Sequence, residues 1–289
     1  MSRIPHVHIV LFCITCLTTL TAGALLSGAN LLADPAGIFA GVPFAGTLMT
    51  ILLCHEFGHY FAARRHNTSA TLPYFIPAPP IPPLVIGTFG AFIKMKSPIM
   101  TREALIDIGA SGPVAGFLVS VVACIIGLGL SPVISLEQAE GMITLGDSLL
   151  FTFLSWLVVG TLPANTDILL HPVAFAGWIG LFITAMNLIP IGQLDGGHIL
   201  YALFGKRHGT ISAMLVGVLG ALGTAAFLWD VGWPGWGVWA ILMLILGIDH
   251  PPVYHWNERL ENSRRLLGIF ALIIFLLTFV PTPIQIHWE

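Results

Sequence analysis

Two histidines four residues apart, with a glutamate beside the first, interrupt the apolar stretch LLCHEFGHYFAARR at residues 52–65. On a helix, residues four apart share a face, so His55 and His59 can direct imidazole nitrogens toward one metal ion. Glu56 can then accept a proton from a water that the metal activates. The pattern fixes only three positions and can arise by chance in a soluble protein. Ionisable groups at membrane depth are costly, however, and usually mark functional sites.

The composition is that of an integral membrane protein. The 289 residues are 56% hydrophobic and only 9% charged, whereas soluble domains carry roughly 25% charged residues. The net charge of −3 gives no reason to expect nucleic-acid binding. We predict an all-α polytopic fold of about six to seven transmembrane helices. The predicted spans are about 8–32, 37–63, 104–130, 171–190, 209–229, 233–249 and 265–280.

The apolar stretch 142–160 decides the topology. If it does not cross, all eleven Lys and Arg residues lie on the cytoplasmic side with a cytoplasmic N-terminus. If it does cross, the basic residues after it change sides. We therefore predict a surface-lying or re-entrant helix there. The tryptophans at 229, 233, 236 and 239 are interpreted as an interfacial belt.

The segment 72–97 is not expected to be helical, because six prolines lie between residues 73 and 83. Branched and aromatic residues follow, interrupted by Gly87 and Gly90. This pattern is typical of short strands with a bend or bulge, so we predict a small membrane-associated β segment near 84–95.

A catalytic zinc usually has three protein ligands, so one more is expected outside the HEFGH turn. Apart from Glu56, the acidic residues considered within the predicted spans or at their cytoplasmic ends are Asp107, Asp195 and Asp249. Asp195 lies in NLIPIGQLDGGHIL, residues 187–200, where proline and glycines predict a re-entrant break near 187–198. We predict Asp195 as the third ligand; the alternative is an Asp-Gly turn at the membrane interface. Asp107 and Asp249 are expected to serve in helix packing or at the interface.

The remaining histidines are less informative. His198, three residues after Asp195, is predicted to orient that carboxylate by hydrogen bonding. The others are interpreted as surface or interface residues: His66, His171, His208, His250, His255 and His287.

HEFGH in an early span and NLIPIGQLDGGH in a later one together resemble the site-2 protease family of intramembrane zinc metalloproteases. The resemblance implies a zinc ion held by His55, His59 and Asp195, with Glu56 as base. It also implies that Asn187 assists at the scissile carbonyl, where its amide can donate a hydrogen bond to the developing oxyanion. The stretch GTFGAF resembles the membrane-associated strand of that family. We therefore predict substrate contacts at Thr88, Phe89 and Gly90.

The resemblance covers roughly residues 50–250, and we predict a single membrane-embedded domain over 1–289 with its motif-bearing core at about 37–250. Many members of the family carry a PDZ domain or a pair of CBS domains. The predicted outside loop is too short for a PDZ fold and the sequence ends at Glu289, so a compact form without either module is expected.

The predicted function is that of a zinc endopeptidase that cleaves transmembrane segments of membrane-protein substrates, with the lipid bilayer as its surroundings. Two alternatives stay open: a polytopic transporter, for which broken helices are also typical, and a catalytically silent metal-binding scaffold. Neither of these explains Glu56, since a structural metal site needs no base. A short N-terminus without a transit segment favours a prokaryotic cell membrane.

Overall fold

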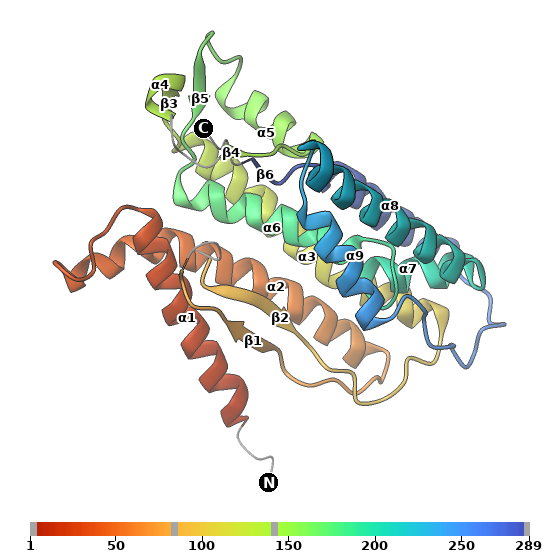
Figure 1. Ribbon diagram of the computed structural model, residues 1–289. Coiled ribbons are helices and arrows are strands. Elements are labelled where there is room, and N and C mark those ends of the chain that lie inside the picture. Colours follow the sequence, from red (N-terminus) through yellow and green to blue (C-terminus); the bar gives the residue numbers. More distant parts are fainter. Residues whose placement is uncertain (1–4, 82–85, 140–143, 286–289) are drawn as a thin grey trace. The chain divides into compact units, whose positions relative to one another are not determined.

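The computed structural model describes residues 5–81, 86–139 and 144–285, and it is mostly helical (Figure 1). Four helical stretches in these residues are long and apolar enough to cross a membrane. They are α1 (His6–Leu26), the 3-10 helix η1 (Pro35–Gly41) followed directly by α2 (Val42–Arg65), α3 (Arg102–Gly129) and α8 (Arg207–Trp229). Each corresponds to a span predicted from hydropathy.

The other helices are shorter. They are α4 (Leu136–Ala139), α5 (Leu149–Val159), α6 (Pro172–Leu188), α7 (Asp195–Phe204), α9 (Gly235–Leu246) and α10 (Asn262–Thr278). At 1.5 Å per residue, the 11 residues of α5 extend about 17 Å, too short for ~30 Å of hydrocarbon. The same argument applies to the 12 residues of α9, which extend about 18 Å, so helix length does not support the full span predicted at 233–249.

Three small two-stranded sheets accompany the helices in the described residues. The first joins β1 (Tyr74–Pro77) to β2 (Thr88–Phe92), the second β3 (Val133–Ser135) to β5 (Thr166–Ile168), and the third β4 (Thr144–Leu145) to β6 (Ile284–Gln285). β2 lies inside the β segment predicted near 84–95, of which residues 84 and 85 are outside the described residues. β1 was not predicted.

The β1–β2 pair is antiparallel and irregular, as the two glycines of the segment suggested. Its register shifts between Phe75 and Pro77, and Gly90 on the opposite strand has a φ of 96°. At Gly87, whose φ is 76°, an added Cβ would overlap the backbone of Thr18 in α1. The Thr18 hydroxyl donates a 2.6 Å hydrogen bond to the Gly87 carbonyl. These contacts attach the sheet to α1.

The chain divides into two compact units, each with its own packing. Unit 1 contains residues 1–97, 114–134 and 155–181, and unit 2 contains 98–113, 135–154 and 182–289. The division passes through α3, α5 and α6, so these continuous helices contribute residues to both units. The predicted single domain remains a prediction.

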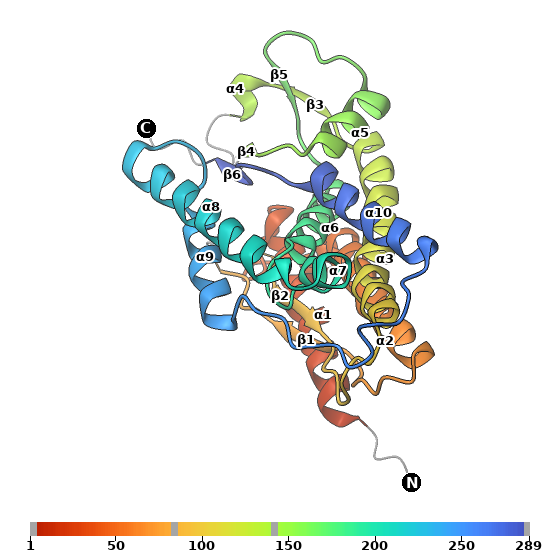
Figure 2. The same cartoon turned by 90° about the vertical axis from the view of Figure 1, so that its right-hand side faces the viewer.

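Within unit 2, α8 and α9 lie side by side (Figures 1 and 2). Gly223 makes this possible, because a Cβ at that position would overlap the backbone of Gly237. Trp236 is only 2% exposed, and its indole N–H donates a 2.7 Å hydrogen bond to the Pro281 carbonyl. The predicted interfacial belt is therefore wrong at Trp236, which belongs to the protein core. Its polar atom is satisfied by the chain itself rather than by the membrane surface.

Candidate metal centre

Helix α2 carries the first two candidate ligands. Pro43 lies in its first turn, where the missing backbone N–H has no helical partner to lose. The helix ends at Arg65, and Asn67 follows with a left-handed φ of 53°. There the Thr68 N–H donates a 2.9 Å hydrogen bond back to the Ala63 carbonyl. The HEFGH sequence thus lies well inside a regular helix, which preserves the i, i+4 spacing.

The three ionisable residues of this turn are buried. His55, Glu56 and His59 are 4%, 5% and 6% exposed. The Nε2 atoms of His55 and His59 lie 3.1 Å apart. Two imidazole nitrogens bound to one tetrahedral zinc at 2.0–2.1 Å are separated by roughly 3.3–3.4 Å. The observed separation is within a few tenths of an ångström of that value, so the two nitrogens are spaced as a shared metal requires.

The other side of the His55 ring is packed against helix α3, within unit 1. Gly116 lies there, and a Cβ at this position would be 3.1 Å from His55 Nδ1 and 3.3 Å from its Cβ. The absence of a side chain at Gly116 therefore lets α3 approach the ring. This leaves Nε2 as the nitrogen that faces His59.

Asp195 begins α7, directly after a non-helical break at residues 189–194. The predicted break near 187–198 is therefore confirmed but is shorter than expected. The prediction that Gly196 and Gly197 interrupt a helix is wrong. Both residues form part of the first turn of α7. The first turn is also a favourable place for the Asp195 carboxylate, because the helix dipole stabilises negative charge there.

The glycines around Asp195 are explained by close backbone packing within unit 2. A Cβ at Gly196 would overlap the carbonyl oxygen of Leu188, and one at Gly197 would overlap that of Gly192. The break thus folds back onto the first turn of α7. Gly192 itself has a φ of 56° and lies against the carbonyl oxygen of Gly247. The LDGG sequence consequently fixes where α7, and with it Asp195, begins.

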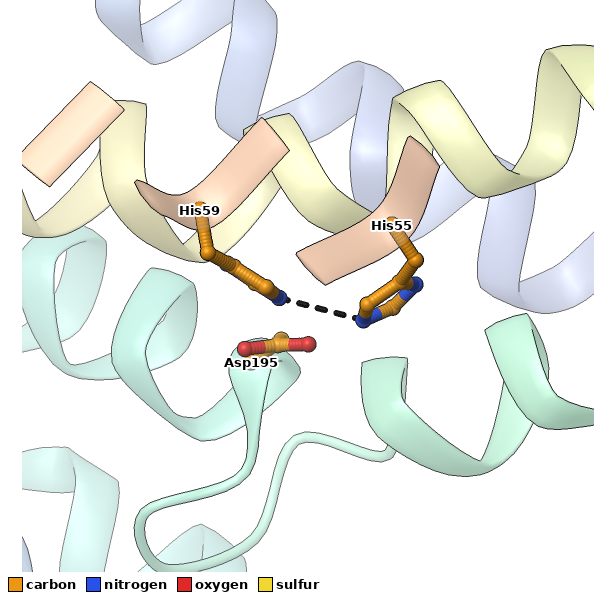
Figure 3. A group of neighbouring side chains, drawn as sticks. All are labelled: His55, His59 and Asp195. Carbon is orange, nitrogen blue, oxygen red and sulfur yellow. Dashed lines mark hydrogen bonds between the residues drawn. The ribbon is translucent and has the colours of Figure 1, made fainter. Parts of the chain in front are cut away.

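Among the described residues, one group of three potential metal ligands is present: His55, His59 and Asp195. One ligand atom of each lies within 4.8 Å of those of the other two. Figure 3 shows the Asp195 carboxylate directed toward the two imidazoles from the start of α7. Two neutral imidazoles and one carboxylate are a donor set that suits zinc and leaves a fourth position for water. The residues therefore fit a catalytic zinc.

The other predicted site residues have defined positions. Asn187 is half-buried in the last turn of α6. Thr88 is buried, and its hydroxyl donates to the Ile76 carbonyl at 2.9 Å and accepts from the Gly90 N–H at 3.0 Å, so its side chain holds the β1–β2 pair together. Phe89 is 58% exposed. Contact of these residues with a substrate remains a prediction.

Two of the predicted minor roles can also be compared with the structure. Asp107 forms an ion pair with Arg264 at 3.3 Å, which agrees with a role in helix packing. His208 was interpreted as a surface residue, which is wrong, because it is 2% exposed.

Sequence reasoning missed two residues near the candidate ligands. Gly116 is one of several small residues at 107–117, and no local signal in the sequence identifies which side chain it faces. His250 had been interpreted as a loop histidine at the surface, but its ring lies 2.7 Å from His198. An aromatic or histidine contact between distant segments leaves no trace in a single sequence.

Known proteins and one family profile resemble this chain. The sequence profile of "Peptidase family M50" matches residues 43–229. The chain is 32% identical over 245 residues to "Probable zinc metalloprotease EGY2, chloroplastic" of Oryza sativa subsp. indica, covering 82% of this chain and 42% of that protein. It is 34% identical over 252 residues to "Probable zinc metalloprotease EGY1, chloroplastic" of Arabidopsis thaliana, covering 84% and 43%.

The chain thus spans about two fifths of the length of these curated relatives. No solved structure matches it. The profile match extends over more than half of the chain and includes both the HEFGH turn and the LDGG turn. The chain belongs to peptidase family M50, the site-2 protease family.

Proposed function

We propose that this chain is a membrane-embedded zinc endopeptidase that hydrolyses peptide bonds in or near transmembrane segments of other membrane proteins. The convergence of His55, His59 and Asp195, with Glu56 on the same helical turn, is the observation that carries this proposal.

The three ligands would hold zinc through His55 Nε2, His59 Nε2 and a carboxylate oxygen of Asp195. When bound there, zinc supplies Lewis-acid activation of a water molecule and of the peptide carbonyl. Burial of both imidazoles keeps competing water away from the nitrogens that would bind the metal. Asp195 lies in the first turn of α7, where the helix dipole favours the negative charge that a carboxylate ligand carries.

Glu56 is assigned as the general base. It adjoins His55 on α2 and is buried. Its carboxylate can therefore take the proton of the attacking water at a position shielded from bulk solvent. The same carboxyl group can then give that proton to the departing amine nitrogen. The peptide C–N bond breaks in that step, and Glu56 returns to its ionised form.

Asn187 is proposed to assist the same reaction. Its side-chain amide, in the last turn of α6, is a donor that can stabilise negative charge developing on the carbonyl oxygen of the scissile bond. Such a donor is neutral and does not compete with Glu56 for the proton.

A helical substrate hides its peptide groups in its own hydrogen bonds, so it must unwind before cleavage. We propose that β2 holds the unwound segment extended by strand pairing, with the exposed Phe89 beside it. Thr88 would then contribute indirectly, since its hydroxyl is used inside the β1–β2 pair. Substrates with helix-breaking residues should be cut faster than uninterrupted helices.

The test separates metal binding from proton transfer. Purified wild type, Glu56→Gln and His59→Ala would be reconstituted with tagged single-span peptides, half of them carrying a Pro or Gly break in the span. Glu56→Gln should retain zinc and fold normally while the cleavage rate falls about 10²- to 10⁴-fold, the usual cost of losing a general base. His59→Ala should lose both zinc and cleavage.

A Glu56→Gln protein that cuts at close to the wild-type rate would contradict the proposed mechanism. It would also move the transporter alternative ahead, because that reading gives Glu56 no chemical task. Retention of zinc in Asp195→Ala would remove this aspartate from the metal site.

The proposed membrane arrangement places the N-terminus in the cytoplasm and α5 at the membrane surface or re-entrant. The short length of α5 supports this reading. The named relatives are chloroplast proteins of plants, while the prokaryotic cell membrane expected from the sequence remains a prediction for this chain.

A further inference from the structure

Residues 247–256, the first part of the connection between α9 and α10, run along α7 within unit 2, and we call them the α9–α10 strap. Figure 2 shows this blue segment passing below the end of α7 before α10 begins. Before α7, the carbonyl of Gly247 in the strap lies against Gly192 in the break. After α7, Trp256 of the strap lies against Gly205, the residue that directly follows the helix. One segment thus contacts the residues that flank the helix carrying Asp195 on both sides.

The middle of the strap contacts α7 through His250. This ring stacks on Tyr201, with centroids 4.3 Å apart and planes 12° apart. Its Nε2 lies 2.7 Å from Nδ1 of His198, and its own Nδ1 lies 2.7 Å from the Pro251 carbonyl oxygen. Both ring nitrogens of His250 are therefore engaged.

These contacts determine which nitrogens carry protons. A carbonyl oxygen can only accept, so the Nδ1 of His250 carries a hydrogen and donates to Pro251. Burial lowers the pKa of His250, with the nearby His208 acting in the same direction and the Pro251 hydrogen bond opposing them. The ring is then neutral and its Nε2 must accept from the Nδ1–H of His198. A neutral His198 is then the Nδ1–H tautomer, with its Nε2 unprotonated.

His198 lies three residues after Asp195, on the same face of the first turns of α7. Helix α3 also contacts this turn. A Cβ at Gly109 would be 3.1 Å from both the Asp195 carbonyl oxygen and the His198 Cβ. The start of α7 is therefore contacted by the backbone of α3 and, through His198, by the strap.

We propose that His250 is a positioning residue, which fixes the orientation and the Nδ1–H tautomer of His198 and thereby the first turn of α7 that presents Asp195. This inference rests on the proposed function in one respect, that Asp195 is a metal ligand. Partners that orient metal-binding groups are themselves worth about 10- to 100-fold in metal affinity or activity. The strap would thus control the metal site from a loop outside it.

Two substitutions separate hydrogen bonding from packing. His250→Phe keeps an aromatic ring for Tyr201 but cannot accept from His198, whereas His250→Gln loses the ring and keeps an acceptor near the Nε2 position. Zinc affinity, measured by competition with a chromophoric chelator, should fall about 10- to 100-fold in His250→Phe and only a few fold in His250→Gln. His255→Gln, in the same strap, is the matched control and should bind zinc as wild type does, since the His255 ring is exposed and pairs with Glu258.

A second readout does not depend on zinc. In metal-free protein labelled with 15N-histidine, the His198 ring should show a protonated Nδ1 and an unprotonated Nε2, and this pattern should be lost in His250→Phe. The His198 signals are assigned by their disappearance in His198→Gln. A protonated Nε2 on His198 in the wild type would overturn the proposal even if His250→Phe failed to fold.

The outcomes also separate this inference from the proposed function. If Asp195→Asn loses zinc but His250→Phe does not, the metal site stands and the role of His250 is wrong. If His250→Gln is damaged more than His250→Phe, the residue serves packing and the proposal fails. If Asp195→Asn binds zinc as tightly as wild type, the proposed ligand set is wrong, and the 15N spectra still decide whether His250 fixes the His198 ring.

Discussion

Gly116→Ala is predicted to weaken zinc binding without unfolding the protein. The added Cβ would lie 3.1 Å from His55 Nδ1, a distance at which the neighbour must give by a few tenths of an ångström. Zinc–ligand distances tolerate only about 0.2 Å. We therefore expect zinc affinity to fall by about 10- to 100-fold, or about 1.4–2.7 kcal/mol. The stability of the helix itself should increase, because replacing glycine with alanine inside α3 favours the helical state by up to about 1 kcal/mol.

The assay measures zinc affinity by chelator competition and the melting temperature by circular dichroism on the same detergent-solubilised samples. Gly46→Ala is the matched control, because Gly46 lies in α2, the same helix as His55, and an added Cβ there meets nothing within 4 Å. That control should keep wild-type zinc affinity. Wild-type affinity in Gly116→Ala as well would refute the claim that α3 confines the His55 ring.

Three further predictions concern the membrane topology, the pH dependence of stability, and the different roles of Asp107 and Asp195. Cysteines introduced near Gly141 and Arg207 should be labelled from opposite sides of the membrane; labelling from one side would mean that 142–160 crosses. Because burial places the pKa of His250 below its unfolded value near 6.5, its stabilising contribution is present above that pH and is lost as the pH falls. When the pH is lowered from about 7.5 to about 5.5, the melting temperature of the wild type should therefore fall by more than that of His250→Gln. Asp107→Asn should keep zinc and cost at most about 1 kcal/mol, because its ion pair is partly exposed to solvent, whereas Asp195→Asn should lose zinc.

The three candidate ligands that the structure groups together could be predicted because their signals are local or scarce. His55 and His59 are four residues apart, and helical geometry alone brings such residues to one face. Asp195 is distant in sequence, but few acidic residues occur near the predicted spans, and only this one follows a proline- and glycine-rich break. Low charge content, a property of membrane proteins, is what made the choice so narrow.

Features of the fold that depend on tertiary contacts could not be predicted from the sequence. Tyr74–Pro77 forms β1 in a proline-rich stretch because Pro77 lies at the end of the strand, next to the irregular register, where a missing N–H costs little. Trp236 was assigned to the membrane interface by its residue type, yet the Pro281 carbonyl, 45 residues away, satisfies its indole in the core. In both cases the deciding partner lies far along the chain.

Helix α3 shows how far packing can be predicted from the sequence. Gly109 and Gly116 are seven residues apart, so two helical turns bring them to nearly the same face, and their small size predicts close packing there. The sequence does not say which residues pack against these two glycines. The structure gives each a different neighbour: within unit 2 Gly109 meets the first turn of α7, and within unit 1 Gly116 meets the His55 ring. The support of a metal site by glycine is therefore invisible in residue types and becomes testable only once the neighbour of each glycine is known.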